Sequence, residues 1–207
     1  GIREDEKEAY RKYKNIYSTI LYSDDAVKTF INSYAKNPAF ERTIFIISGD
    51  HRLPEIPIAT KIDRYHVPLI IYSPKLKRTA RFKSISSHLD IAPSILAFLN
   101  ANYNIKTPKL INFIGSGLDT VKSFRNIHKY PLMQTKNELS DFVYGKFFLN
   151  QNTLFAIDDK MGVEAIENED MRLKLFNELK QYKVRNDLVS KVNKLVPDSV
   201  YLKFVNF

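Results

Sequence analysis

The most constraining feature of this 207-residue sequence is a short apolar run, Thr43-Ile-Phe-Ile-Ile-Ser48, which leads directly into Gly49-Asp50-His51. Its apolar residues are continuous rather than alternating, a pattern typical of a strand that is covered on both faces. A second run of this kind covers residues 67–72. Because parallel strands are buried on both faces, we expect an α/β fold with a mainly parallel sheet flanked by helices.

Helical patterns flank the two predicted strands. Residues 10–21 carry an aromatic-rich apolar stripe at three- and four-residue steps, and a second helix is expected to begin at a cap formed by Ser23 or Asp24. A further helix is predicted over residues 90–99, with Asp90 as its N-cap. The order helix, strand, loop, strand, helix indicates half of an α/β sandwich.

The composition changes after about residue 100. Residues 100–137 show little periodicity and are expected to form an irregular connection. Residues 141–149 and 152–157 are predicted to pair as a hairpin, and the tail from about 168 to 194 is predicted to be helical. The predicted apolar face of that helix consists of Leu173, Phe176, Leu179 and Tyr182. We interpret this half as an appended α+β hairpin-and-helix element.

The balance of charged residues restricts the classes of partner. The formal net charge is +9, from 32 Lys and Arg against 23 Asp and Glu, which indicates either attraction to polyanions or simple solubility. The basic residues are dispersed and match no recognised nucleic-acid module, so nucleic acid is not an expected partner. The sequence has no Cys, which excludes disulfides, thiolate metal sites and a Cys nucleophile within it.

The strongest candidate for chemistry is the Asp50-His51 pair at the carboxyl end of the first predicted strand. Ligands of open α/β sheets gather outside the carboxyl ends of strands, and a Gly allows the backbone to turn there. A carboxylate oxygen together with an imidazole nitrogen suits Mn²⁺ or Zn²⁺ better than Ca²⁺ or Mg²⁺. The alternative interpretation is a surface turn in which Asp50 caps the backbone and His51 is solvated.

Several segments of the first half together resemble a known family. Residues 22–25, 43–51, 67–74 and 88–96 resemble, in this order, the C-terminal half of a sulfatase of the alkaline-phosphatase superfamily. Within that superfamily the sequence is similar to the lipoteichoic-acid-synthase-like sulfatases. Residues 113–119 also resemble a segment of such proteins. The resemblance implies the C-terminal half of an alkaline-phosphatase-like sandwich.

The resemblance also implies a function and a set of site residues. It implies a metal-dependent hydrolase of sulfate or phosphate esters in which Asp50 and His51 bind the divalent cation. The cation would polarise the sulfuryl or phosphoryl oxygen and lower the pKa of the nucleophile. Three weaker candidates for contacts to the substrate are Arg52, Lys61 and His88. Arg52 directly follows the pair and is either a bidentate contact to an oxyanion or part of a surface salt bridge. Lys61 is either the lysine that touches the sulfate in many sulfatases or a solvated lysine, and His88 either lines the cleft or hydrogen-bonds near the helix start.

One departure from the family concerns the nucleophile, a formylglycine or a Thr that lies in the family's N-terminal half. No catalytic residue is therefore assigned in this sequence. We expect residues 1–100 to be the C-terminal part of the catalytic domain and residues 101–207 to pack on it. The chain alone is expected to be inactive and to expose surface that the N-terminal half would cover.

The expected partners are a sulfated or phosphorylated glycan or lipid substrate and that N-terminal half. The resemblance further implies an exported, cell-envelope protein that is membrane-anchored at full length. Two other functions remain open: a phosphoglycerol or phosphoethanolamine transferase of the same superfamily, and a non-catalytic module that binds anionic glycans or lipids. The second of these predicts salt-sensitive binding of polyanions that does not depend on metal.

Overall fold

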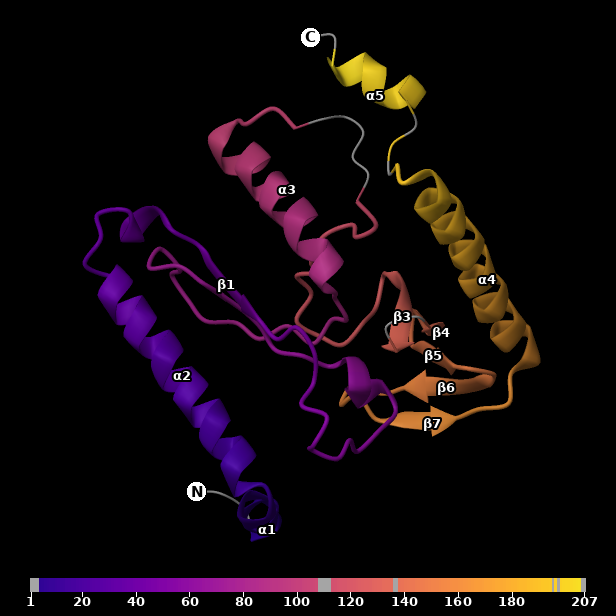
Figure 1. Cartoon of the computed structure of the whole chain (residues 1–207), viewed down its shortest axis with the longest axis horizontal. Helices are drawn as coiled ribbons and strands as arrows, with labels where there is room; N and C mark the ends of the chain where they lie inside the picture. The colour runs from indigo at the N-terminus through magenta and orange to yellow at the C-terminus, as the bar shows by residue number, and fades with distance from the viewer. Residues whose placement is uncertain (1–3, 108–112, 136–137, 195, 197, 206–207) are drawn as a thin grey trace. The chain divides into compact units, whose positions relative to one another are not determined.

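The computed structural model describes residues 4–107, 113–135, 138–194, 196 and 198–205 (Figure 1). Its α-helices are α1 (Glu4–Lys12), α2 (Lys14–Tyr34), α3 (Ile91–Tyr103), α4 (Glu169–Val192) and α5 (Asp198–Val205). Its strands are β1 (Phe45–Ser48), β2 (Leu69–Tyr72), β3 (Lys129–Thr135), β4 (Glu138–Tyr144), β5 (Phe147–Asn150), β6 (Thr153–Ile157) and β7 (Val163–Ala165). The fold is therefore mixed, with helices and sheets.

The chain divides into two compact units. The first contains Gly1–Ile58 and Tyr65–Thr79, and the second contains Ala59–Arg64 and Ala80–Phe207. The domain boundary predicted between residues 100 and 101 falls inside α3, within the second unit.

The predicted start of a second helix at Ser23 or Asp24 is wrong, because α2 continues through both residues. The Ser23 hydroxyl donates a hydrogen bond to the carbonyl of Thr19, four residues earlier, at 2.9 Å. A serine that bonds back along its own helix does not cap a new one. The interruption between α1 and α2 lies instead at Tyr13.

The first unit contains a two-stranded sheet, and its strands are antiparallel. Phe45 of β1 pairs with Tyr72 of β2, and Ser48 pairs with Leu69. The parallel arrangement predicted for these strands is wrong, and so is the prediction that both are covered on both faces, since every β2 residue is exposed. Continuous apolarity does not encode strand direction, and residues 49–68 contain only a short 3₁₀ turn rather than the crossover helix that parallel strands need.

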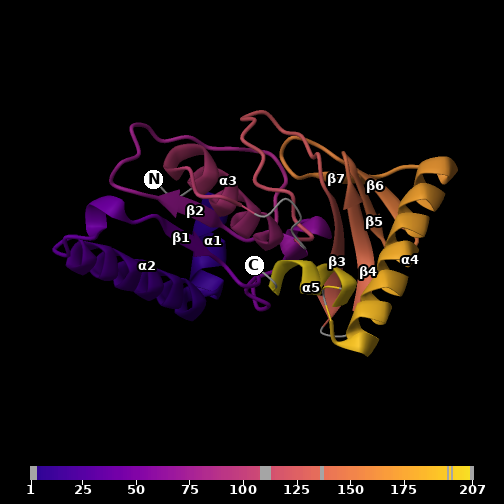
Figure 2. The same ribbon diagram turned by 90° about the horizontal axis from the view of Figure 1, so that it is seen from above.

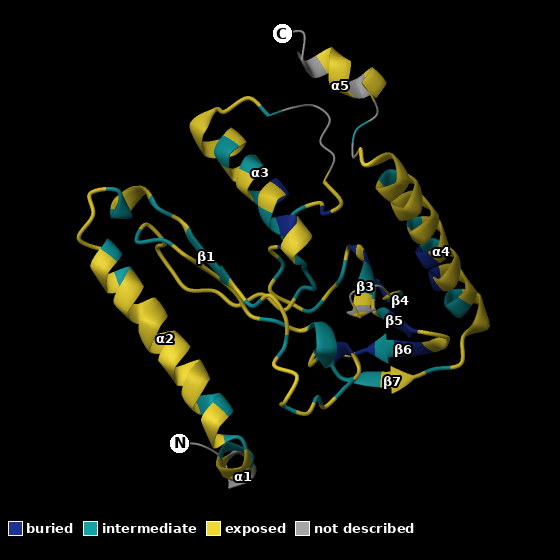
Figure 3. Cartoon of the chain, in the orientation of Figure 1, coloured by how far each residue is buried: buried dark blue, intermediate teal, exposed yellow. Residues whose placement is uncertain are grey.

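The packing of the first unit rests on an aromatic cluster between α2 and the sheet. Phe45 of β1 contacts Tyr34 edge to face, with ring centroids 5.5 Å apart, and stacks on Tyr72 at 5.9 Å. Phe30 and Phe40 also lie within 6.3 Å of Phe45. None of the described side chains of this unit is buried, and α2 is mostly exposed (Figure 3).

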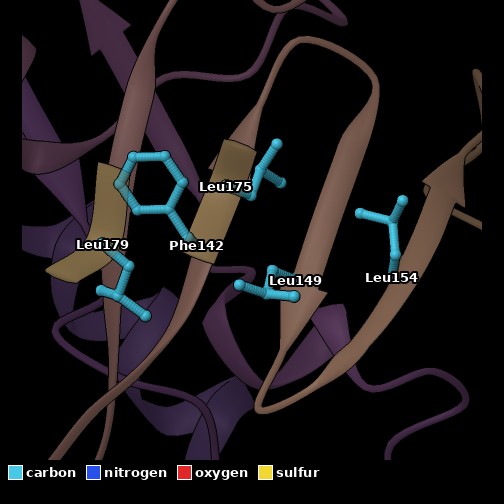
Figure 4. Packing of buried hydrophobic residues seen from close by; sticks show 5 residues of the cluster. All are labelled: Phe142, Leu149, Leu154, Leu175 and Leu179. Carbon is cyan, nitrogen blue, oxygen red and sulfur yellow. The ribbon is translucent and has the colours of Figure 1, made fainter. Parts of the chain in front are cut away.

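The second unit is built on a five-stranded antiparallel sheet in the order β3-β4-β5-β6-β7. Helix α4 packs along one face of this sheet (Figure 2). The core between them consists of side chains from β4, β5, β6 and α4, shown in Figure 4: Phe142, Leu149, Leu154, Leu175 and Leu179. This unit therefore has a hydrophobic core of its own.

The hairpin turn predicted around Asn150 is confirmed, since β5 and β6 pair across it. Residues 141–149, predicted as one strand, form parts of β4 and β5, because Gly145 turns the chain with φ of +55°. β3 lies within residues 100–137, so the prediction of an irregular connection is wrong for that segment. Residues 108–112 and 136–137 lie outside the described residues.

The predicted C-terminal helix is confirmed as α4, but its predicted inner face is partly wrong. Asn168 caps the helix by accepting a hydrogen bond from the backbone N–H of Met171 at 2.9 Å. Leu175 and Leu179 face the sheet and are buried, whereas Leu173 and Phe176 are exposed. Among the described residues, no helix combines the length and apolar character needed to span a lipid bilayer.

Candidate metal-binding pair

The Asp50-His51 pair follows β1 directly, where the end of β1 is fastened to the start of β2. The backbone N–H of Gly49 and the hydroxyl of Ser48 both donate to the carbonyl of Pro68, at 3.2 and 3.0 Å. A Cβ atom on Gly49 would lie 3.2 Å from side-chain atoms of Val67 and Pro68, closer than ordinary contact. Glycine therefore allows the two chain segments to pass close together just before the pair.

The side chains of Asp50 and His51 lie together rather than on opposite sides of the backbone. The Oδ2 atom of Asp50 is 3.6 Å from Nε2 of His51, and the backbone N–H of His51 donates to Oδ1 of Asp50 at 2.9 Å. Both side chains are exposed, Asp50 by 88 % and His51 by 69 %. A contact so open to solvent contributes little to stability.

A further hydrogen bond orients the imidazole. Nδ1 of His51 lies 2.7 Å from the carbonyl oxygen of Arg52, an acceptor, so we assign the ring proton to Nδ1. In the neutral ring Nε2 then carries the lone pair, and it lies 3.6 Å from Oδ2 of Asp50. Metal-binding histidines are commonly held in this way, with the remote nitrogen donating to a backbone carbonyl.

The pair fits two positions in the coordination shell of one cation. Two ligands about 2.1 Å from the same tetrahedral ion lie about 3.4 Å apart, close to the observed 3.6 Å. A carboxylate and an imidazole are donors that suit Mn²⁺ or Zn²⁺. No group of three or more His, Cys, Asp or Glu residues gathers as a metal site in the described part of the chain.

The side chain of Arg52 hydrogen-bonds to the loop that follows the pair. Its Nη1 atom donates to the carbonyls of Leu53, Pro54 and Ile56 at 3.0 to 3.1 Å. This guanidinium therefore joins three backbone carbonyls of residues 53–56. Its predicted contact to a substrate oxyanion stays a prediction.

Lys61 and His88, the other predicted substrate contacts, belong to the second unit, whereas Asp50, His51 and Arg52 belong to the first. The ammonium of Lys61 lies 5.3 Å from the centre of the Phe155 ring, within the range of a cation–π contact. His88 is exposed in the short 3₁₀ helix His88–Asp90 that precedes α3. Their substrate roles also stay predictions.

Asp90 has a larger role than the N-cap predicted from the sequence. Asp90 occupies the predicted N-cap position of α3, but its side chain makes no cap hydrogen bond to that helix. Ser87 is the N-cap of the preceding 3₁₀ helix, and Asp90 completes a capping box there by accepting a hydrogen bond from the Ser87 N–H at 2.8 Å. The fully buried carboxylate also accepts from the N–H groups of Ser116 and Gly117, at 3.0 and 3.2 Å, and from the Tyr130 hydroxyl. Burial and the bond to Asp90 together raise the pKa of the Tyr130 hydroxyl.

The backbone of the loop of residues 113–119 packs closely against the backbone beside this carboxylate. A Cβ atom on Gly115 would lie 2.1 Å from the carbonyl oxygen of Leu89, so only glycine fits there. The buried ring of His128 stacks on Tyr130 and lies 3.0 Å from the Ser116 hydroxyl through Nδ1. The loop is recognisable in the sequence by its Gly-Ser-Gly segment, whereas no feature of the sequence indicated a structural role for His128.

A salt bridge closes the end of the same loop. The guanidinium of Arg125 donates from Nε and Nη2 to the two carboxylate oxygens of the buried Asp119, at 2.6 and 2.9 Å. This bidentate pair holds the pKa of Asp119 below its usual value. The loop is thus fixed at one end by Asp90 and at the other by Arg125.

Comparison with known proteins bears on the segment that holds the pair. Residues 2–101 match the family model described as Sulfatase, a span just under half of the chain that contains Asp50 and His51. No curated protein and no solved structure matches the chain. The match supports the sulfatase family, and with it a sulfatase-type hydrolase, for this part of the chain.

Proposed function

We propose that this chain contributes to a metal-dependent, sulfatase-type hydrolase of sulfate or phosphate esters, with Asp50 and His51 as two ligands of a bound Mn²⁺ or Zn²⁺. The observation that carries the proposal is the orientation of His51. Its Nδ1 donates a hydrogen bond to the Arg52 carbonyl at 2.7 Å, while Nε2 lies 3.6 Å from the Asp50 carboxylate. The family match over residues 2–101 supports the same proposal.

The residues of the chain have separate tasks in this proposal. Asp50 supplies a negatively charged oxygen and His51 a neutral nitrogen, and Arg52 keeps the loop in the form that orients the imidazole. Lys61 and His88 are proposed to contact the anionic ester group. A divalent cation bound at the pair would polarise the ester oxygen and favour the ionised form of a nucleophile.

We further propose that a second polypeptide segment supplies the nucleophile and the remaining metal ligands. The first unit supports this, because none of its described side chains is buried. All four side chains of β2 are exposed, and three of them are Leu or Ile. An apolar sheet left open in this way favours a covering segment. The cell-envelope location and membrane anchor proposed for the intact protein depend on the family resemblance.

Metal titration by calorimetry tests the proposal directly. Wild type, Asp50→Ala, His51→Ala and the control His66→Ala are titrated with Mn²⁺ and with Zn²⁺. We expect wild type and His66→Ala to bind one ion weakly through the two ligands of the pair, and at least tenfold weaker binding after either change at the pair. His66 is a suitable control because it is another exposed histidine of the first unit. Equal binding by all four proteins would overturn the proposal.

A further inference from the structure

The outer face of α4 carries large apolar side chains that do not contribute to the core between the helix and the sheet. Leu175 and Leu179 already bury the inner face against the sheet. The opposite face carries five large apolar side chains that are 41 to 62 % exposed: Leu173, Phe176, Val184, Leu188 and Val192. Their spacing of three, four and eight residues places them on the outer half of the helix, where Asn177, Lys180 and Gln181 also project. We call these five residues the outer stripe.

Basic side chains lie among and beside the residues of the outer stripe over the second half of α4. These residues are exposed, and no ion pair joins them to a carboxylate among the described residues: Lys180, Lys183, Arg185 and Lys191. Asp187 is the acidic residue in the same stretch. The segment from 180 to 192 therefore has a net charge of +3 beside three exposed apolar side chains.

We propose that the outer face of α4 docks on an anionic lipid surface. The outer stripe enters the boundary between headgroups and acyl chains, and Lys180, Lys183 and Lys191 contact the lipid phosphates. Arg185 instead lines a small cavity with Lys129 and Phe142 beside the sheet. A helix that is apolar along one side and cationic at its flanks binds at this interface without spanning the bilayer. The inner contacts with the sheet hold α4 in place, so the helix does not have to fold on binding.

The shape and charge of this face favour lipid over protein partners. From Leu173 to Val192 the stripe extends about 28 Å along the convex surface of a helix. A fluid lipid surface adapts to such a shape. A second copy of the chain would bring the same basic residues together, and like charges oppose that contact.

Vesicle co-sedimentation of the full chain tests this proposal, with phosphatidylcholine vesicles that contain 30 % phosphatidylglycerol or none. We expect binding to the anionic vesicles only, and loss of binding in 1 M salt, where the screening length is about 3 Å. Changing Lys180, Lys183 and Lys191 together to Gln should weaken binding by about 100-fold, since each surface charge contributes about fivefold. Leu188→Ser should weaken it by about tenfold.

Matched controls identify the surface that binds. Lys75→Gln, Lys77→Gln and Arg78→Gln together remove the same charge from the first unit, and Leu21→Ser changes an equally exposed leucine of α2. Both controls should bind as wild type does. The proposal is overturned if wild type does not bind anionic vesicles, or if the controls weaken binding as much as the α4 variants. A dimer that Leu188→Ser dissociates would also overturn it, in favour of self-association.

Discussion

Replacing Asp90 by Asn tests how much a single buried carboxylate stabilises the second unit. Oδ1 of Asp90 accepts from the N–H groups of Ser116 and Gly117, and Oδ2 accepts from the N–H of Ser87 and from the Tyr130 hydroxyl. Asparagine has the same shape but only one accepting oxygen. If the amide oxygen takes the Oδ1 position, the Ser87 N–H loses its acceptor. In the other orientation, Ser116 and Gly117 lose theirs.

The expected loss follows from these contacts. Each orientation leaves at least one buried backbone N–H facing an amide NH₂ group, and all remaining bonds lose the charge of the carboxylate. We expect Asp90→Asn to lower the free energy of unfolding by about 3 kcal/mol. For a chain of this size, the midpoint of thermal unfolding then falls by about 10 °C.

Urea unfolding followed by far-ultraviolet circular dichroism measures this loss. The matched control is Asp187→Asn, an exposed aspartate on α4, where we expect a change within about 0.5 kcal/mol. A free-energy loss for Asp90→Asn as small as that of the control would refute the role assigned to the buried carboxylate.

Three further predictions test the core and the loop of the second unit. Leu175→Ala should cost about 3 kcal/mol in urea unfolding, whereas the exposed Leu188→Ala should change little, and equal losses would contradict the packing of α4. Because Arg125 lowers the pKa of folded Asp119, their interaction stabilises the protein above pH 3.8, the ordinary pKa, and this contribution is lost as the pH falls through the lowered value. Asp119→Asn should therefore approach wild-type stability only in acid, and a stability difference that does not change with pH would count against this. Gly115→Ala should cost about 1 to 3 kcal/mol in thermal unfolding, and a neutral result would show that the loop is not seated as described.

The local elements were largely predictable from residue patterns, whereas the sheet pairing was not. The run before Gly49 and the apolar spacing after Asn168 identified β1 and α4 correctly. Strand direction was missed because it depends on the connection between strands and not on their composition. The inner face of α4 was partly missed because the helix is apolar on two sides, and periodicity alone cannot say which side meets the sheet.

The candidate site was predictable only where neighbouring residues determine the geometry. Asp50 and His51 are adjacent, and a turn beside Gly49 was sufficient to bring them together. The hydrogen bonds of Asp90 reach residues 26 to 40 positions further along the chain, including Ser116 and Tyr130. Such long-range contacts leave no local periodicity, so the sequence indicated only a helix cap at that position.

The most direct test of the central claim is to detect the His51 nitrogen on a bound metal. Pulsed electron paramagnetic resonance of the Mn²⁺-loaded protein should show coupling to an imidazole ¹⁴N nucleus. That coupling should disappear in His51→Gln and persist in His66→Gln. If the wild-type spectrum shows no nitrogen coupling, or if the coupling is unchanged in His51→Gln, the assignment of the Asp50-His51 pair as metal ligands is contradicted.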